Sequence, residues 1–175
     1  MSKAQPDFNE QRSDATGLRF AIMVSRWNSN FTDKLLRGAI EALQSCGATP
    51  DAVEVFKVPG AFELPLASMK AAESGKFDAV IALGVVIRGD TPHFDYVAGE
   101  AARGIMEAGL QTGVPVMFGV ITADNEQQVI ERCGEGPANK GYEAAVSAVE
   151  VANLFREMAQ DQGVKEKEKT VSHVV

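Results

Sequence analysis

Several residue types that mark particular classes of protein are scarce in this 175-residue chain. There are two cysteines, Cys46 and Cys133, which lie far apart and lack the spacing of metal ligands. There are also two histidines, and one of them, His173, lies in the C-terminal tail. Because structural metal sites draw mainly on cysteine and histidine, we expect neither a structural metal nor a disulfide.

Positive charge and long apolar runs are scarce as well. The formal net charge is −7 at pH 7, which argues against a general nucleic-acid binder but leaves room for a local basic pocket that takes a small anion. No apolar run approaches the roughly 20 residues of a membrane span. The N-terminus is polar with early acidic residues, unlike a secretory signal. We therefore expect a cytoplasmic protein that binds neither nucleic acid nor membranes.

The chain does contain enough apolar sequence for one domain with a substantial core, since 45% of its residues are hydrophobic. We predict three parts. A flexible N-terminal segment occupies 1–16, a folded domain occupies 17–160, and a charged C-terminal tail occupies 161–175. Within that tail lysine and glutamate alternate over 165–169, which is typical of a solvated end.

Strand and helix patterns alternate along the folded part. A helix after the first strand would have Thr32 as its N-cap and end at Gly47. Such alternation, with strands that are apolar throughout, is typical of a parallel sheet covered by helices on both faces. We therefore predict an α/β fold of the flavodoxin-like type, a three-layer α/β/α sandwich around a four-stranded parallel sheet. The other predicted elements are strands at 18–24, 53–58, 79–87 and 114–121 and helices at 63–74, 92–111, 125–133 and 141–159.

The segment Gly84–His93 combines a buried strand with reactive side chains. The apolar run 79–87 leads directly into an arginine, a glycine, a carboxylate, a hydroxyl and a histidine. Thr91 and Pro92 are typical of a helix start, as N-cap and first helical residue. His93 would then lie in the first helical turn, where the positive end of the helix favours a neutral imidazole suited to acid–base chemistry. The alternative is a histidine with a purely structural role.

The ends of the other strands also carry distinctive residues, and in a parallel sheet all these ends meet at one edge. Trp27 follows the first strand and is either a hydrophobic plug or a flat surface on which an aromatic ligand stacks. Phe62 and Glu63 follow the second strand. They are either a core side chain and a helix-start acid or, beside Trp27, a slot for a ring with a carboxylate that accepts hydrogen bonds.

An anion site is a further interpretation of the same edge. Free N–H groups at the predicted helix start, with the hydroxyl of Thr91, would cradle a phosphate if the side chain of Asp90 points away. Arg132 and Lys140 bracket the glycine-containing segment 134–139. They are either surface cations or, in the case of Arg132, a clamp on a phosphate.

Five motifs follow one another along the chain. They are Val24–Asn28, Val58–Pro65, Gly84–His93, Pro115–Val120, and Asn139–Gly141 with Ala144–Glu150. Together they resemble the 6,7-dimethyl-8-ribityllumazine synthase family, over about residues 18–154. The ordered combination is far more specific than any single motif.

This resemblance implies an activity and a set of site residues. The family joins 5-amino-6-(D-ribitylamino)uracil to 3,4-dihydroxy-2-butanone 4-phosphate, without cofactor or metal, and releases phosphate and water. His93 would be the catalytic residue that transfers protons. Many relatives carry phenylalanine where Trp27 stands, and the larger ring would keep the stacking role. By resemblance, the pyrimidine and its ribityl chain would be bound by Trp27, Ala61, Phe62, Glu63, Val85, Val86, Ile87, Phe118 and Lys140, and the phosphate by Asp90, Thr91 and Arg132.

The resemblance also implies a homo-oligomer. The family forms pentamers, some of which build a 60-subunit shell, and Phe118, Arg132 and Lys140 would complete the site of the neighbouring subunit. The short segment between Arg132 and Lys140 lacks the insertion typical of pentamer-only members and favours the shell. Riboflavin synthase is a further partner that the family suggests.

Two alternatives remain at this stage. One is a non-catalytic paralogue that forms a shell and binds lumazine or flavin. The other is a flavodoxin-like electron-transfer protein, which leaves His93 and Arg132 unexplained.

Overall fold

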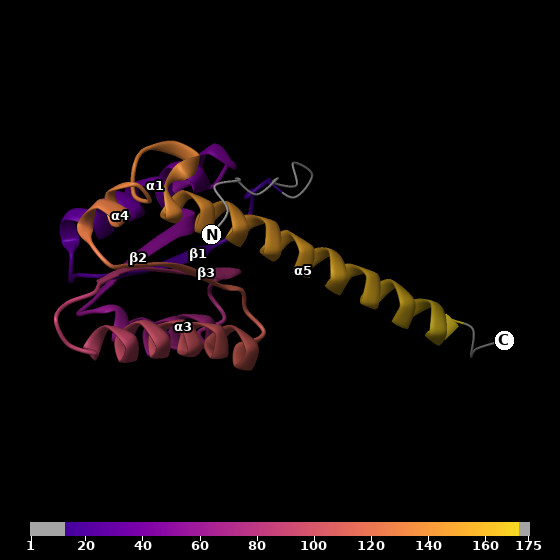
Figure 1. Cartoon of the computed structure of the whole chain (residues 1–175). Coiled ribbons are helices and arrows are strands. Elements are labelled where there is room, and N and C mark those ends of the chain that lie inside the picture. The colour runs from indigo at the N-terminus through magenta and orange to yellow at the C-terminus, as the bar shows by residue number, and fades with distance from the viewer. Residues whose placement is uncertain (1–12, 172–175) are drawn as a thin grey trace.

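Four parallel strands form the central sheet of the computed structural model, which describes residues 13–171 (Figure 1). Neighbouring strands are parallel throughout, in the order β2-β1-β3-β4. The predicted four-stranded parallel sheet is therefore confirmed, and two strands, at 53–58 and 79–87, have the predicted bounds. The strands are β1 (Phe20–Ser25), β2 (Val53–Val58), β3 (Ala79–Ile87) and β4 (Val116–Ala123).

Helices cover both faces of this sheet, which confirms the three-layer sandwich (Figure 1). α1 (Ser29–Ser45) and α5 (Lys140–Val171) pack together on one face, and α2 (Leu64–Glu73) and α3 (His93–Thr112) pack together on the other. The short helix α4 (Glu126–Ile130) follows β4 on the side of α1. Three 3₁₀ turns complete the connections: η2 (Pro50–Ala52), η3 (Ala61–Glu63) and η4 (Gly136–Ala138).

The core lies on both faces of the two inner strands. Successive residues of a strand point to opposite sides, so Phe20 and Ile22 of β1 pack under α1 and α5, whereas Ala21 and Met23 pack under α2 and α3. In β3, eight of the nine residues are buried. A strand buried on both faces forms a continuous apolar run, and this explains why β3 can be recognised from the sequence.

The first helix begins earlier than predicted. α1 starts at Ser29, and its N-cap is Asn28, whose backbone adopts a left-handed conformation with φ 59°. Thr32 is not the cap, because it lies inside the helix and its hydroxyl donates to the carbonyl oxygen of Ser25 at 2.9 Å. The helix therefore starts immediately beyond Trp27.

The ends of the chain also differ from the prediction. α5 continues to Val171, so the predicted charged tail begins inside a helix, and of 161–171 the backbone alone is described. Most of the predicted N-terminal segment, 1–12, lies outside the described residues, but Ala15 is buried and its N–H donates to the carbonyl oxygen of Cys46 at 2.7 Å. Within 13–171, no helix combines the length and apolar character that crossing a membrane requires.

The start of α5 makes a close contact with α1. A Cβ atom at Gly141 would lie 2.0 Å from the carbonyl oxygen of Leu35, and one at Gly38 would lie 2.6 Å from the side chain of Asn139. The buried Asn139 amide donates to the carbonyl oxygen of Lys34 in α1 at 3.1 Å and to a carbonyl of the loop before α5 at 2.7 Å. Asn139 therefore ties that loop and the start of α5 to α1, and glycine at both positions leaves room for it.

Replacing Gly141 with alanine is expected to destabilise the fold strongly. The added methyl group would meet backbone, which cannot rotate away, so the free energy of unfolding should fall by about 3 kcal/mol. Denaturant unfolding measures the loss. Gly134→Ala is the control, because a Cβ there meets nothing within 4 Å, and it should change stability by less than about 0.5 kcal/mol. Equal unfolding midpoints for the two variants would contradict this packing argument.

Candidate active site

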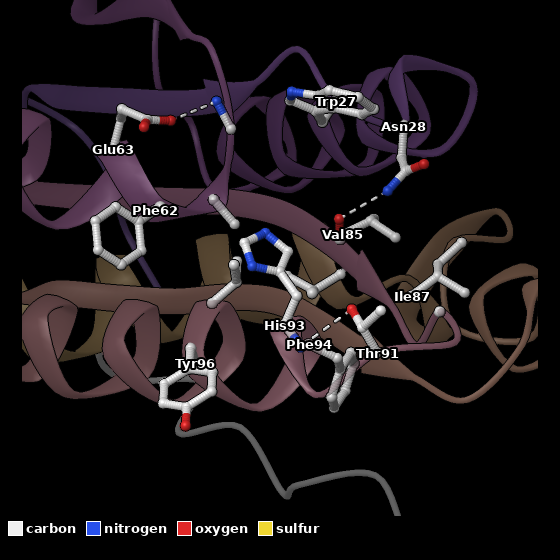
Figure 2. A pocket seen from close by; sticks show the side chains of 15 residues that line it. Trp27, Asn28, Phe62, Glu63, Val85, Ile87, Thr91, His93, Phe94 and Tyr96 are labelled. Atoms are coloured by element: carbon white, nitrogen blue, oxygen red, sulfur yellow. Dashed lines mark hydrogen bonds between the residues drawn. The ribbon is translucent and has the colours of Figure 1, made fainter.

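A cavity of about 670 Å³ opens at the carboxyl ends of β1, β2 and β3 (Figure 2). Its walls are Trp27 and Asn28 after β1, Gly60–Glu63 after β2, Val85–Ile87 at the end of β3, and residues between Gly89 and Val97 around the start of α3. The chain runs from β1 outward to β2 and then returns to β3 on the other side of β1. Open α/β sheets bind ligands in the crevice that such a reversal leaves.

The cavity brings together most of the site residues predicted from the sequence. Those that line it come from four separate stretches of the chain, as expected if the strand ends converge. They are Trp27, Ala61, Phe62, Glu63, Val85, Val86, Ile87, Thr91 and His93.

Three aromatic rings of this cavity are exposed: Tyr96 of α3, with a relative exposure of 71%, and Trp27 and Phe62 at the strand ends. Trp27 has a relative exposure of 73% and Phe62 of 57%, although both are large and apolar. A Cβ atom at Gly60 would lie 3.3 Å from the ring of Trp27 and 3.2 Å from a carboxylate oxygen of Glu63, so glycine leaves room for both side chains. Trp27 is therefore not a hydrophobic plug within this chain, and its exposed face suits a flat ligand.

The carboxylate of Glu63 has a fixed direction. Its Oε2 accepts a hydrogen bond from the backbone N–H of Gly60 at 2.8 Å, across the turn that η3 forms (Figure 2). A carboxylate has two oxygens with several acceptor positions, so Glu63 keeps the capacity to accept hydrogen bonds from a ligand in the cavity.

His93 is the first residue of α3, and its ring points from the helix into the cavity (Figure 2). The helix starts one residue later than predicted, with Pro92 as the N-cap. The hydroxyl of Thr91 still lies at the helix start, where it accepts from the backbone N–H of His93 at a long 3.5 Å. The imidazole of His93 and the hydroxyl of Thr91 thus come from the same helix start, and both residues line the cavity.

Four predicted site residues do not line this chain's cavity: Asp90, Phe118, Arg132 and Lys140. Phe118 is 46% exposed on the edge strand β4. The Nη1 of Arg132 donates to the carbonyl oxygen of Gln128 at 2.7 Å. The ammonium of Lys140 pairs with Glu143 at 2.5 Å. Arg132 lies in the segment between α4 and α5, and Lys140 is the first residue of α5.

Some residues of the cavity were missed by the sequence-based prediction. Asn28 is the most informative, because its side-chain amide donates to the carbonyl oxygen of Val85 at 2.9 Å and so joins the ends of β1 and β3. An asparagine directly before a helix is a recognisable signal, since asparagine tolerates left-handed backbone better than most residues. The others are Gly60, Gly89, Phe94, Tyr96 and Val97. Among the side chains that the structure describes, those of 13–160, no three of His, Cys, Asp or Glu gather as metal ligands would.

The fold and the cavity define a class: α/β proteins with an open parallel sheet and a ligand site at the point where the strand order reverses. A family model described as 6,7-dimethyl-8-ribityllumazine synthase matches residues 17–156. A protein of that name from Chlorobium chlorochromatii (strain CaD3) is 51% identical over 144 residues, which are 82% of this chain and 93% of that protein. The chain belongs to the 6,7-dimethyl-8-ribityllumazine synthase family. It is therefore an enzyme, a transferase of riboflavin biosynthesis.

Asn28 allows a test of how the cavity wall is held. Asn28→Gly and Asn28→Ala both lose the hydrogen bond to Val85, but alanine must also place a Cβ atom at φ 59°. The left-handed backbone costs an ordinary residue about 1–2 kcal/mol, so Asn28→Ala should be less stable than Asn28→Gly by about 1 kcal/mol. Denaturant unfolding of the pair measures the difference. If alanine proved as stable as glycine, the left-handed backbone at this position would not limit stability.

Proposed function

We propose that this enzyme condenses 5-amino-6-(D-ribitylamino)uracil with 3,4-dihydroxy-2-butanone 4-phosphate to form 6,7-dimethyl-8-ribityllumazine, phosphate and water. The observation that carries the proposal is the composition of the cavity. It combines exposed aromatic rings, a hydrogen-bonded carboxylate and a histidine at a helix start. These groups suit a planar, hydrogen-bonding amine and a phosphorylated ketone, which are the two reactants.

The pyrimidine would lie against Trp27, with the backbone groups of Val85–Ile87 at its edge. β4 pairs with these residues on one side, whereas the pairing with β1 ends at Leu83. Beyond the Val85 carbonyl, which accepts from Asn28, the backbone groups on the β1 side can therefore hydrogen-bond to a heterocycle. Ala61, Phe62 and Glu63 would hold the ring and the ribityl chain. The fixed carboxylate of Glu63 would accept from N–H or O–H groups of this substrate.

The phosphate of the second substrate would lie at the start of α3. Free backbone N–H groups at a helix start and the hydroxyl of Thr91 favour an anion there, and the loop residue Asp90 would contribute through its backbone. Arg132 would complete the phosphate site from a neighbouring subunit. Its guanidinium fork suits the oxygens of a phosphate.

The chemistry then needs little beyond proximity and proton transfer. The amine attacks the ketone to give a carbinolamine, which loses water to form an imine. A proton leaves the carbon beside the imine, and phosphate departs from the next carbon. The ribitylamino nitrogen then closes the second ring, and a further water is lost. His93 would carry protons among these steps, while much of the rate would come from holding both reactants together.

The site would be shared between subunits. Phe118, Arg132 and Lys140 lie away from this chain's own cavity, which is where residues that serve a neighbour are expected. Leu66 of α2 and Leu110 of α3, with relative exposures of 65% and 75%, are large apolar side chains that a partner subunit would cover. We propose a pentamer as the unit of function, and twelve pentamers in a 60-subunit shell.

A non-catalytic paralogue that binds lumazine or flavin is the alternative. The same aromatic cavity would serve it, but it would have no use for His93 or for the phosphate-binding groups. Supplying both substrates separates the two functions, because the paralogue would bind the product and form none.

Loss of His93 should slow the reaction without abolishing it. In His93→Ala, kcat should fall by about 100-fold, the lower end of what proton transfer contributes, because proximity still accelerates the reaction. Lumazine fluorescence and phosphate release measure turnover. His173→Ala, at the other histidine of the chain, is the control and should keep wild-type kcat. An unchanged kcat in His93→Ala would remove the acid–base role, and a wild-type enzyme that forms no lumazine would refute the function.

A site built from two subunits can be tested by mixing defective subunits. His93→Ala and Arg132→Ala should each be slow alone. Reassembled together in equal amounts, they should regain about a quarter of wild-type activity, because random neighbours leave that share of sites intact. Activity no higher than the average of the separate variants would place Arg132 in its own subunit's site or outside any site.

Sedimentation measures the mass of the assembly. A species of five times 18.7 kDa would contradict the 60-subunit shell.

A further inference from the structure

Arg88 connects three segments of the chain at the rim of the cavity without lining it. Its Nε donates to Oδ1 of Asp124, just beyond β4, at 3.1 Å, and its Nη2 donates to Oδ1 of Asp95, in the first turn of α3, at 2.9 Å. The guanidinium also lies over the ring of Phe94, 4.1 Å from its centre. Phe94 lines the cavity and is the immediate neighbour of His93.

These contacts show that Arg88 is engaged by the protein itself. An arginine close to a phosphate site would ordinarily be a candidate ligand for the phosphate. Here, the hydrogen bonds that Arg88 donates to Asp95 and then to Asp124 raise the pKa of Arg88 above its ordinary value, and both carboxylates neutralise its charge. The guanidinium of Arg88 is therefore held by carboxylates of its own chain and is not available to clamp a phosphate, the role proposed for Arg132.

The base of the Arg88 side chain is fixed in the sheet. Its backbone N–H donates to the carbonyl oxygen of Ala123 at 2.9 Å and so continues the pairing of β3 with β4. Its far end meets Asp95, whose own N–H donates to the carbonyl oxygen of Pro92 at 3.0 Å in the first turn of α3. The side chain thus connects the edge of the sheet to the turn that carries His93.

The segment between Arg88 and α3 gives that turn little support of its own. Gly89, Asp90 and Thr91 are exposed and belong to no helix or strand. The hydrogen bond from the backbone N–H of His93 to the Thr91 hydroxyl is long, at 3.5 Å. The orientation of the His93 ring therefore depends on how the first turn of α3 is seated against the sheet.

We propose that Arg88 is a positioning residue for catalysis, which seats the first turn of α3 by bridging Asp124 and Asp95 and so aims His93 into the cavity. The inference rests on the proposed function. The side chain of Arg88 is 42% exposed, and those of its partners are 59% and 66% exposed. Solvated ion pairs add little to global stability, so the role of Arg88 is in local geometry.

The test is a kinetic cycle between Arg88 and His93. Arg88→Gln should lower kcat by about 10-fold, since small misplacements of a catalytic group slow reactions steeply. In the His93→Ala background the same substitution should lower kcat by less than about twofold, because a residue that acts by orienting the His93 ring has no effect once that ring is gone. Asp95→Asn should reproduce the loss, and Arg88→Lys should recover part of it through one remaining charged contact.

Arg103 of α3, the helix that carries His93, provides a matched control. It pairs with Glu100 and Glu107 of α3, as Arg88 pairs with Asp95, but its partners lie beyond the cavity. Arg103→Gln should keep wild-type kcat. Melting temperatures should change by less than about 3 °C in both arginine variants, as expected for exposed pairs.

The outcomes separate this proposal from the proposed function. Normal kcat in Arg88→Gln would overturn the role of Arg88 alone. A loss of the same size in the presence and absence of His93 would overturn it as well, since Arg88 would then act on phosphate binding or on folding. If the unaltered enzyme formed no lumazine, the proposed function and the role of Arg88 would fall together.

Discussion

The reversal of strand order between β1 and β3 is the constraint on which the rest of this structure depends. The chain leaves β1 for β2 on one side and returns to β3 on the other, so the loops that follow diverge above the sheet. The hydrogen bond from Asn28 to the carbonyl oxygen of Val85 spans this divergence and fixes its width. The aromatic rings, the carboxylate and the imidazole can share one cavity because they stand on the edges of this opening.

The layers of the fold could be predicted because the local patterns agree with the tertiary structure. β3 is buried on both faces, so its sequence is apolar throughout, and its bounds follow from that run. The same alternation predicts that the strand ends meet at one edge, and Trp27, Glu63 and His93 do line one cavity there. The predicted site residues that follow β1, β2 and β3 could be placed in one cavity for this reason, whereas Phe118 and Lys140 do not line it.

Structural features that depend on contacts between residues far apart in the sequence could not be predicted from local sequence patterns. The start of α1 is set by Asn28, whose left-handed backbone is held by a residue of another strand. The tie from Asn139 to α1 needs glycine at Gly38, about a hundred residues away in sequence. Arg132 lies outside this cavity, so its proposed contact with the phosphate rests on the resemblance and on a neighbouring subunit.

The exposure of Trp27 and Phe62 has a thermodynamic consequence for the empty enzyme. Both rings face water, and a ligand that covers them displaces that water from apolar surface. Removing apolar surface from water lowers the heat capacity of the system. Binding of the proposed pyrimidine substrate should therefore become more exothermic as the temperature rises. The hydrogen bond from the Gly60 N–H already orders the Glu63 carboxylate, so binding does not have to supply that free energy.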